Sequence, residues 1–458
     1  MSAADDRRWC RAVGLCAVLL FALTASGKPT SWDGTVMMDV AYRLWYLGRW
    51  DIAITPQELP AALRTKYVPW GVGMRGPDGR QYSAYGPGFS LAAVPLVAVA
   101  DGLARLSGAD PPLFVVYFVN AITTGASCGA VAALALALGL SRRRALLAAA
   151  AFGFATFAWV YAKFDFSEPL CTLCLVCAVH RLVRYDAEGH AFHLVLAGLW
   201  SGAALLTRVA AVIALPVLLA MVQATVAQRR SGGFVAASAA LGAGLVPAAV
   251  GLALYNALRT GMVLSTGYTG GGVYFFGNPL SVGVPGLLWS LHQGIAVYAP
   301  LSLLWPLAVV RMARCDPGRV RVFLALPIVF LLFHAKLIGW HGGPTWGPRY
   351  LHSVLPFLAI PVAGYVGSRA ALAAALLAGA AVNLSAVLVF WERQLAPWVW
   401  RGEALHPFVP DFWFLTNDVV PPAARALAVA LLELGAVGAG WWVWRGLGRR
   451  ATSSAPPA

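Results

Sequence analysis

Three carboxylates lie directly beside apolar runs that are long enough to cross a lipid bilayer. Asp33 follows the first run, and Asp165 and Glu168 come just before a later one. A carboxylate this close to hydrocarbon is costly unless it is paired or has a function. An Asp or Glu beside a bound hydroxyl group acts as a general base. The sequence therefore identifies these three residues as candidate catalytic groups, and Asp33 as the favoured base.

A second set of residues has the chemistry to bind an anionic substrate. Arg208 lies between two apolar runs, and the planar fork of a guanidinium matches a phosphate group. Snorkelling to the interface, or a salt bridge to an acidic loop residue, is the alternative for this arginine. The remaining candidates for substrate binding are Lys336, His341, Arg349, Tyr350 and Tyr85. For His341 a structural role is the alternative.

Asp33 itself has a structural alternative. An Asp before Gly34 and Thr35 is typical of a helix N-cap. Asp39 lies six residues further on and on a different face of a helix, so we expect it to be a solvated interfacial residue. One carboxylate can both cap a helix and act as a base.

Metal binding is a further hypothesis for the carboxylates. Asp33, Asp165 and Glu168 together are possible ligands of a divalent metal ion, although three carboxylates in separate loops do not establish a site. Cys171, Cys174 and Cys177 lie in an apolar run without a second pair of ligands elsewhere in the sequence. Zinc and iron–sulfur sites need about four ligands, so we interpret these cysteines as helix-packing residues.

Composition decides the class of protein. Of the 458 residues, 59% are hydrophobic and only 12% are charged, which is too few for the polar surface of a soluble domain. The net charge of +15 comes from short basic clusters between apolar runs, which the positive-inside rule explains without nucleic-acid binding. Three arginines precede the apolar stretch 12–24, which we interpret as an uncleaved first membrane helix.

The basic clusters also predict the topology. If the apolar segment 89–106 lies along the outer interface, every later cluster falls on the cytoplasmic side; if it spans, they change sides. We therefore predict an all-α polytopic membrane protein with a long exoplasmic first loop that carries interfacial helices, and with both termini cytoplasmic. About twelve spans are expected, at 9–26, 113–140, 144–162, 167–184, 191–207, 209–227, 233–256, 293–310, 321–339, 350–366, 370–391 and 421–444.

Several runs on the predicted exoplasmic side resemble the GT-C glycosyltransferases, a superfamily that includes the protein O-mannosyltransferases and the lipid A aminoarabinose transferases. The first-loop pattern is Asp33-Gly34, Asp39, Ala41, Arg43, Leu44, Gly48, Arg49 and Trp50. In that family an acidic residue after the first span precedes a Gly-x-Trp by about fifteen residues. Tyr85-Gly86-Pro87-Gly88 resembles the turn before the family's interfacial helix, Asp165 and Glu168 match its second acidic position, and the run from Trp340 to Tyr350 is similar to a motif of bacterial members.

The resemblance implies an inverting transferase that moves a sugar from a polyprenyl-phosphate donor to an exoplasmic glycan, lipid or protein. It implies a catalytic transmembrane module at 1–230 with the exoplasmic loop 27–112 and a variable transmembrane module at 231–450. The tail 451–458 is rich in Ser, Pro and Ala, a composition that predicts disorder. The expected location is the inner or plasma membrane, with the active site on the exoplasmic face. A lipid-linked sugar flippase or other transporter, and a polysaccharide polymerase or ligase, are the alternatives.

Overall fold

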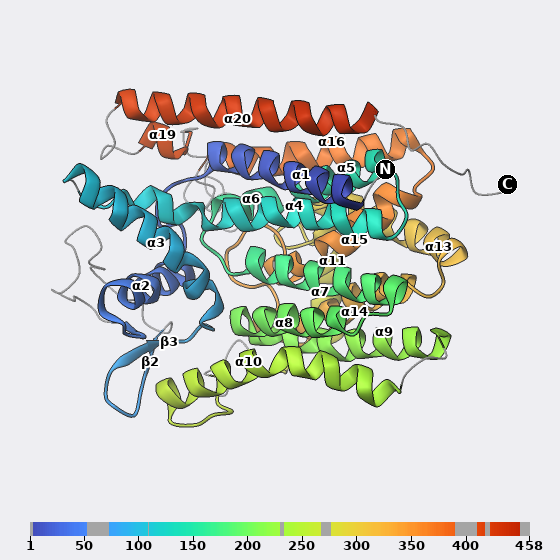
Figure 1. Ribbon diagram of the computed structural model, residues 1–458, viewed down its shortest axis with the longest axis horizontal. Helices are drawn as coiled ribbons and strands as arrows, with labels where there is room; N and C mark the ends of the chain where they lie inside the picture. The colour runs from blue at the N-terminus through green and yellow to red at the C-terminus, as the bar shows by residue number, and fades with distance from the viewer. Residues whose placement is uncertain are drawn as a thin grey trace.

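A bundle of long, roughly parallel helices forms most of the protein, and smaller elements cover one of its ends (Figure 1). The computed structural model describes residues 3–52, 73–108, 110–229, 233–266, 276–389, 410–416 and 422–448. The predicted boundary between the two modules at 230, the predicted tail 451–458 and part of the predicted first loop lie outside the described residues.

The first half of the chain alternates between the bundle and the end that the smaller elements cover. Its elements, in order, are α1 (Ala3–Thr24), α2 (Trp32–Leu47), β1 (Asp51–Ile52), β2 (Gly73–Arg75), β3 (Gln81–Ser83), α3 (Gly88–Ser107), the 3-10 helix η2 (Leu113–Phe118), α4 (Val119–Ala137), α5 (Arg142–Phe154), α6 (Ala158–Lys163), α7 (Glu168–Glu188), α8 (Phe192–Thr207), η3 (Val209–Ile213) and α9 (Ala214–Arg229). The strands form one antiparallel sheet in the order β1-β3-β2, with Tyr82 opposite both Asp51 and Met74.

The second half adds helices around the same bundle. Its elements are α10 (Phe234–Thr260), α11 (Leu280–Trp289), α12 (Ile295–Tyr298), η5 (Pro300–Leu304), α13 (Trp305–Cys315), α14 (Val320–Ala335), η6 (Arg349–Val354), α15 (Leu355–Tyr365), α16 (Arg369–Leu388), α19 (Trp413–Thr416) and α20 (Pro422–Gly448). Helix α20 packs along α1, where the Trp9 indole donates to the carbonyl of Val443 over 3.1 Å.

Glycines allow the closest helix contacts in the bundle. A Cβ atom on Gly125 of α4 would lie 2.5 Å from the backbone nitrogen of Val18 in α1. On the other side, a Cβ atom on Gly198 of α8 would lie 2.0 Å from the carbonyl oxygen of Leu241 in α10. Neither distance is tolerable, so glycine is required for these helix pairs to pack at this separation. Small residues at helix interfaces are typical of membrane bundles, in which close van der Waals packing replaces the hydrophobic effect.

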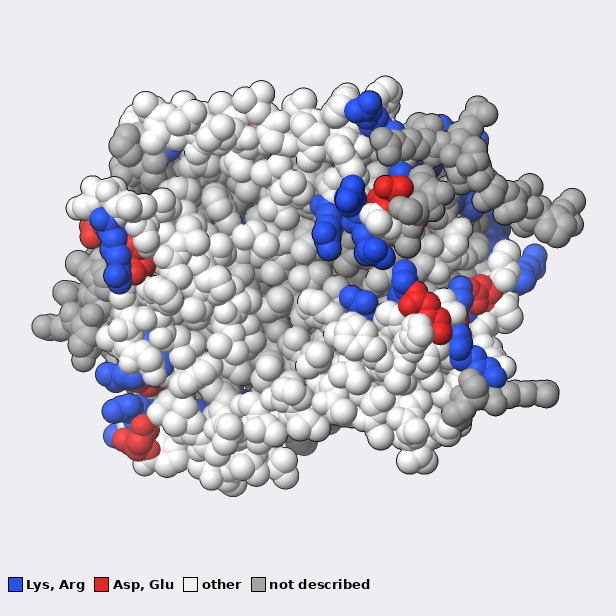
Figure 2. Space-filling view, viewed as in Figure 1, with Lys and Arg blue, Asp and Glu red and all other residues white. Residues whose placement is uncertain are grey.

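The surface of the bundle is that of a membrane protein. Charged side chains lie towards the two ends of the molecule and leave an uncharged band between them (Figure 2). On the outer face of α20, Leu427, Leu431 and Leu434 are 62%, 60% and 69% exposed, and they follow a helical spacing. Among the described residues, six helical stretches are long and apolar enough to cross a membrane: Gly88–Ser107, Phe114–Ala137, Val209–Arg229, Phe234–Thr260, Arg369–Leu388 and Pro422–Leu447. The count of twelve spans stays a prediction.

The basic clusters lie together at one end of the bundle, here called the basic end. Arg142 at the start of α5 pairs with Asp6 over 2.7 Å and donates to the carbonyl of Gly446 in α20. Other arginines of this end make similar links between helix termini, from Arg144 to the carbonyl of Gly364, from Arg319 to the carboxylate of Asp186 and from Arg229 to the carbonyl of Asp186. The predicted clusters therefore share one side, as the sequence indicated.

This shared end also locates α3. Because Asp6 and Arg142 are in contact, the chain between them must cross the bundle an even number of times, and α1 and α4 supply two crossings. A third crossing by α3 would separate the pair. Helix α3 instead lies obliquely beside α2 at the left-hand end of Figure 1, although its length and composition alone would allow it to span. This placement agrees with the interfacial position predicted for residues 89–106.

Several predicted spans are not single helices. The segment predicted to span at 144–162 is divided into α5 and α6 at residues 155–157, where the Thr156 hydroxyl donates to the carbonyl of Phe152 and accepts from the amide of Ala158. The segment at 293–310 consists of α12, η5 and the start of α13, because Pro300 and Pro306 lack the amide that a continuous helix needs. Helix α11 was not predicted at all.

The prediction for Asp39 was wrong. This carboxylate is 1% exposed and pairs with the Nε atom of Arg43 over 3.1 Å. Arg43 also contacts Asp51 over 3.4 Å, and Arg49 pairs with Asp51 over 2.7 Å. The network connects the end of α2 to β1, so this part of the family-like pattern holds the first loop together. Helical periodicity placed Asp39 on a face away from Asp33 but did not reveal that β1 covers that face.

The first prediction tests the separation of the two ends. In a Cys315→Ser background, which removes an exposed thiol, we expect Asp78→Cys to react with an impermeant maleimide in intact cells. Arg143→Cys should react only after permeabilisation, because residue 143 is exposed at the basic end. Equal labelling of both positions in intact cells would contradict the topology.

Candidate active site

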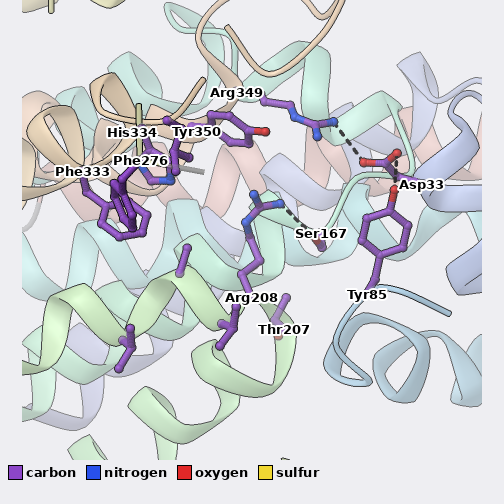
Figure 3. Close-up of a pocket in the computed structure, with 14 residues that line it drawn as sticks. Asp33, Tyr85, Ser167, Thr207, Arg208, Phe276, Phe333, His334, Arg349 and Tyr350 are labelled. Carbon is purple, nitrogen blue, oxygen red and sulfur yellow. Dashed lines mark hydrogen bonds and ion pairs between the residues drawn. The ribbon is translucent and has the colours of Figure 1, made fainter. Parts of the chain in front are cut away.

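A cavity of about 190 Å³ opens at the end of the bundle opposite the basic end (Figure 3). One part of its lining is polar and charged, and the other part is apolar. The lining residues are Asp33, Tyr85, Ser167, Thr207, Arg208, Val209, Ala210, Val212, Phe276, Phe333, His334, Leu337, Arg349 and Tyr350. The cavity thus brings together five of the predicted site residues, which come from both halves of the chain.

Asp33 lies in the first turn of α2 and faces this cavity. Its carboxylate accepts a hydrogen bond from the Tyr85 hydroxyl over 2.7 Å and one from Arg349 Nη1 over 3.1 Å. The N-cap of α2 is Ser31, whose hydroxyl oxygen accepts from the amide of Gly34 over 2.8 Å. The alternative interpretation of Asp33 as the N-cap was therefore wrong, and its side chain is available for other chemistry.

Glu168 forms ion pairs with both arginines of the cavity. Its Oε1 atom lies 2.7 Å from Arg208 Nη1 and 3.7 Å from Arg349 Nε, and the side chain is only 2% exposed. Neither contact is aligned as a hydrogen bond, so these are ion pairs. Arg208 also donates to the hydroxyl of Ser167 over 3.2 Å. The salt bridge was one of the alternatives considered for Arg208, and it leaves 21% of the arginine side chain exposed in the cavity.

Aromatic rings restrict where the two guanidinium groups can lie. The Tyr350 ring is 5.7 Å from Arg208 Cζ and 5.3 Å from Arg349 Cζ, and the Phe166 ring is 5.3 Å from Arg349 Cζ. Cation–π contacts at these distances stabilise a cation that has lost water. Tyr350 in turn stacks on His334 with ring centroids 4.9 Å apart. The arginines are therefore fixed between rings and carboxylates before any ligand binds.

The turn before Arg349 requires a glycine at position 347 of the motif. Gly347 has φ of +70°, and a Cβ atom there would lie 2.9 Å from Cβ of Tyr298. Only glycine accepts both constraints without strain. The tight turn directs the chain so that Arg349, two residues later, enters the cavity at the start of η6.

Asp165 is not part of the cavity lining and packs against the first turn of α2, which carries Asp33. It is 3% exposed, accepts from the amide and hydroxyl of Thr30, and its backbone amide donates to that hydroxyl over 3.0 Å. A Cβ atom on Gly34 would lie 2.0 Å from Asp165 Cγ, so α2 packs directly on this carboxyl. Burial raises the pKa of Asp165 to about 6, partly offset by the hydrogen bonds from Thr30 and Ser31. Its geometry is that of a positioning residue for the turn that carries Asp33.

Comparisons with known proteins support the arrangement of the helices. No protein-family model matches the sequence, and no curated protein matches it. Solved structures do match. ArnT from Cupriavidus metallidurans bound to undecaprenyl phosphate aligns over 97% of this chain and 76% of its own, with 15% identity and a TM-score of 0.51; in the apo state the values are 96%, 74%, 16% and 0.53.

An archaeal structure matches as well. The apo oligosaccharyltransferase of Archaeoglobus fulgidus aligns over 96% of this chain, with 11% identity and a TM-score of 0.52. Its matched part is 56% of its own length, so this chain spans little more than half of that protein. ArnT and this oligosaccharyltransferase are both GT-C membrane glycosyltransferases. The chain has the GT-C fold. The alignments include both halves of the chain, and the division into modules at residue 230 stays a prediction.

Two predicted site residues lie outside the cavity of this GT-C fold. Lys336 is exposed at the end of α14, and its Nζ atom donates to the carbonyl of Asn278 over 3.3 Å. His341 lies in the following loop, where its Nδ1 atom accepts from the amide of Gly343 over 3.0 Å. Burial, and then the nearby charge of Arg349, lower the pKa of His341, which favours the neutral ring. Both residues thus contact backbone groups outside the cavity lining, Lys336 in the segment before α11 and His341 in its own loop.

The predicted metal ligands do not form a ligand set. Asp33 is engaged by Tyr85 and Arg349, Glu168 is next to two guanidinium groups, and Asp165 is packed under Gly34. Within the described part of the chain, no group of three or more His, Cys, Asp or Glu side chains is arranged to hold a metal ion. These three carboxylates therefore do not fit the divalent site considered from the sequence. Arginines occupy the positions next to Asp33 and Glu168.

Arg259 is a residue that the sequence analysis missed. From the last turn of α10 its guanidinium donates to the carbonyls of Ser83, Ala84 and Tyr85 at 3.1, 2.9 and 3.2 Å, and to that of Thr266 at 2.7 Å. It thereby holds the turn that delivers the Tyr85 hydroxyl to Asp33. An arginine at the end of an apolar run, on the side away from the basic clusters, was the available signal, and it had already singled out Arg208.

The second prediction concerns this clamp. Arg259→Lys keeps the charge but cannot reach four carbonyls at once, so we expect faster amide hydrogen exchange in residues 81–88 by about tenfold or more, with the melting temperature lowered only slightly. Arg80→Lys, an exposed arginine on the neighbouring turn, is the matched control and should leave exchange unchanged. Unaltered exchange in Arg259→Lys would show that other contacts hold the turn.

Proposed function

We propose that the protein is an inverting glycosyltransferase that moves a sugar from a polyprenyl-phosphate donor to an acceptor hydroxyl. The observation that carries the proposal is the composition of one cavity: a carboxylate and two arginines at one side, and Val209, Val212 and Phe333 at the other. A lipid phosphate needs both surfaces, because its head group is anionic and its chain is apolar. Solved structures of the same fold support it, since one of them is ArnT bound to undecaprenyl phosphate.

Arg208 and Arg349 would bind the donor phosphate. Guanidinium groups form strong, charge-assisted hydrogen bonds to phosphate oxygens, and they stabilise the charge that grows on the leaving phosphate as the bond to the sugar breaks. Glu168 is paired with both arginines, and these ion pairs fix the positions of the two guanidinium groups before the donor binds. In this proposal Glu168 positions the arginines, and Asp165 positions the turn before Asp33.

Asp33 would act as the general base. The acceptor oxygen attacks the anomeric carbon on the face opposite the phosphate, the C–O bond to the phosphate breaks, and the hydroxyl proton passes to Asp33. Polyprenyl phosphate leaves with the bonding electron pair, and the configuration at the anomeric carbon is inverted. Tyr85 orients the carboxylate through its 2.7 Å hydrogen bond.

Arg349 connects these two roles. In the free protein it is paired with Asp33 over 3.1 Å. A donor phosphate that binds Arg349 would take over part of this pairing. The Asp33 carboxylate would then be released to accept a hydrogen bond from the acceptor hydroxyl only when the donor is in place, which limits wasteful activation of water.

The proposed location is the inner or plasma membrane, with the basic end in the cytoplasm, as the positive-inside rule requires. Both termini would then be cytoplasmic, and the cavity would face the exoplasmic side. The acceptor there would be a glycan, a lipid or a protein. A lipid-linked sugar flippase and a polysaccharide polymerase or ligase remain the rival functions that the experiments must separate.

The third prediction tests the base. Asp33→Asn keeps the shape of the side chain and an oxygen for Tyr85 but cannot take a proton, so transfer should fall about 10²–10⁴-fold. The assay is transfer of radiolabelled sugar from a panel of polyprenyl-phosphate sugars to membranes, run with and without EDTA. Asp110→Asn, at an exposed carboxylate outside the cavity, should retain full activity.

The pattern across variants decides between functions. If Asp33→Asn turns over normally while Glu168→Gln or Asp165→Asn loses activity, Asp33 is not the base, and the role belongs to one of the other two carboxylates. Full activity in all three variants would overturn the transferase proposal and favour the transporter.

The fourth prediction tests the anion site. Arg208→Ala and Arg349→Ala each remove a charged contact worth about 1.5–3 kcal/mol, so donor affinity should fall roughly ten- to hundredfold. Because Arg349→Ala also leaves Glu168 with one fewer partner, Arg349→Lys is needed as a variant that keeps the charge and loses the fork. Binding of polyprenyl phosphate to purified protein is the measurement, and Arg80→Ala is the control. Unchanged affinity in both alanine variants would return these arginines to a purely structural role.

A further inference from the structure

A second hollow region lies in the seam between α9 and α14, near the basic end and away from Asp33. Two adjoining hollows of about 560 and 340 Å³ share Met221, Ala224 and Gly318, so they form one continuous groove. Helix α14 contributes to this groove with its first turns, whereas its other end lines the cavity that contains Asp33. The groove is therefore separate from the candidate active site.

Small side chains on the facing sides of the two helices create the groove. On α9 the lining runs from Pro216 through Ala220 and Ala224 to Ala227, and on α14 it includes Val322 and Ala325. The twelve residues from Pro216 to Ala227 are separated by eleven helical rises, which correspond to about 16 Å of helix. Half of the hydrocarbon core of a bilayer is about 15 Å thick. The apolar part of the groove thus has the length of one acyl chain in the leaflet at the basic end.

The mouth of the groove is polar: the smaller hollow is lined by Asp186, Asp316 and Arg319, and the only charged residue that lines the apolar hollow in the described part of the chain is Arg321. Arg319 is balanced by Asp186 and Asp316, at 2.8 and 3.5 Å. Arg321, in the first turn of α14, lines the apolar hollow and is exposed, and within the described part of the chain no hydrogen bond or ion pair engages it. Gln228 lies at the same mouth and adds an amide. A ligand that complements the apolar hollow has one apolar chain and a negative charge at Arg321, away from the Asp186 and Asp316 carboxylates.

We propose that the groove binds an acidic phospholipid, with one acyl chain along α9 and the phosphodiester at Arg321. A zwitterionic lipid matches the apolar part equally well but brings its own cation to the mouth, where it gains less from Arg321. The site would take its ligand from the membrane around it and does not depend on the donor or on transfer. The bound lipid would fill the seam between α9 and α14. The other end of each of these helices lies near the candidate active site, α9 after Arg208 and η3, and α14 at His334.

Binding to the purified full-length protein in detergent tests the site. Dissociation constants for dioleoyl phosphatidylglycerol and dioleoyl phosphatidylcholine are measured by native mass spectrometry. We expect tighter binding of the acidic lipid, and about fivefold weaker binding of that lipid to Arg321→Gln, the factor for one arginine near an acidic lipid surface. Arg143→Gln, an exposed arginine at the same end but outside the groove, should have no effect.

A steric variant makes the test independent of charge. Ala224→Trp fills the groove at one of the three residues that both hollows share and should abolish binding, whereas Val250→Trp, on the exposed face of α10, should not. Equal affinity for the two lipids, equal loss in Arg143→Gln and Arg321→Gln, or full binding by a folded Ala224→Trp variant would each overturn the proposal. Competition by undecaprenyl phosphate at equal concentration would also overturn it, because the groove would then belong to the donor.

Discussion

A charge beside hydrocarbon must find a partner, and this constraint organises the structure around its cavity. Asp33, Arg349, Glu168 and Arg208 form a chain of ion pairs in which each member belongs to a different element, from α2 through η6 and α7 to the end of α8. Removing one member of such a buried pair leaves an uncompensated charge, which costs about 3–5 kcal/mol. The contacts that hold four elements together are therefore the same contacts that prepare the cavity for an anion.

The sequence predicted the members of this chain because charge next to an apolar run is conspicuous. Asp33, Glu168 and Arg208 were identified in this way, Arg349 was identified from the motif between Trp340 and Tyr350, and all four meet. The positive-inside rule, which also rests on charges beside apolar runs, predicted that the basic clusters share one end and that residues 89–106 do not cross the membrane. The interpretation of charges from their position in the sequence was wrong for Asp39, which is buried and paired with Arg43 inside the first loop, and it did not indicate that Lys336 lies outside the cavity lining, where it donates to the carbonyl of Asn278.

What the sequence could not supply was the geometry of backbone acceptors. Arg259 acts through four carbonyl oxygens, and every residue has a carbonyl, so no pattern of side chains reveals which turn it holds. The breaks at residues 155–157 and around Pro300 were missed for a related reason. A hydropathy pattern reports that a segment is apolar, but not that a threonine hydroxyl or a missing amide divides it. The likeness to known motifs located the loops, and only the structure showed that they converge.

The position of the ion pairs also bears on the choice between transfer and transport. A transporter must expose its site to both sides in turn, and its charged residues usually lie near the bilayer midplane, at broken helices. Here Asp33, Ser167 and Arg208 each occupy the first or last turn of a helix or the adjoining loop, all at the end away from the basic clusters. Beyond that cavity the described core of the bundle is closed by glycine-mediated contacts such as that of Gly125 with Val18, where a single added methyl group would not fit. A bundle with close glycine contacts below the cavity and its charges at one face suits chemistry on a substrate that arrives and leaves at that face.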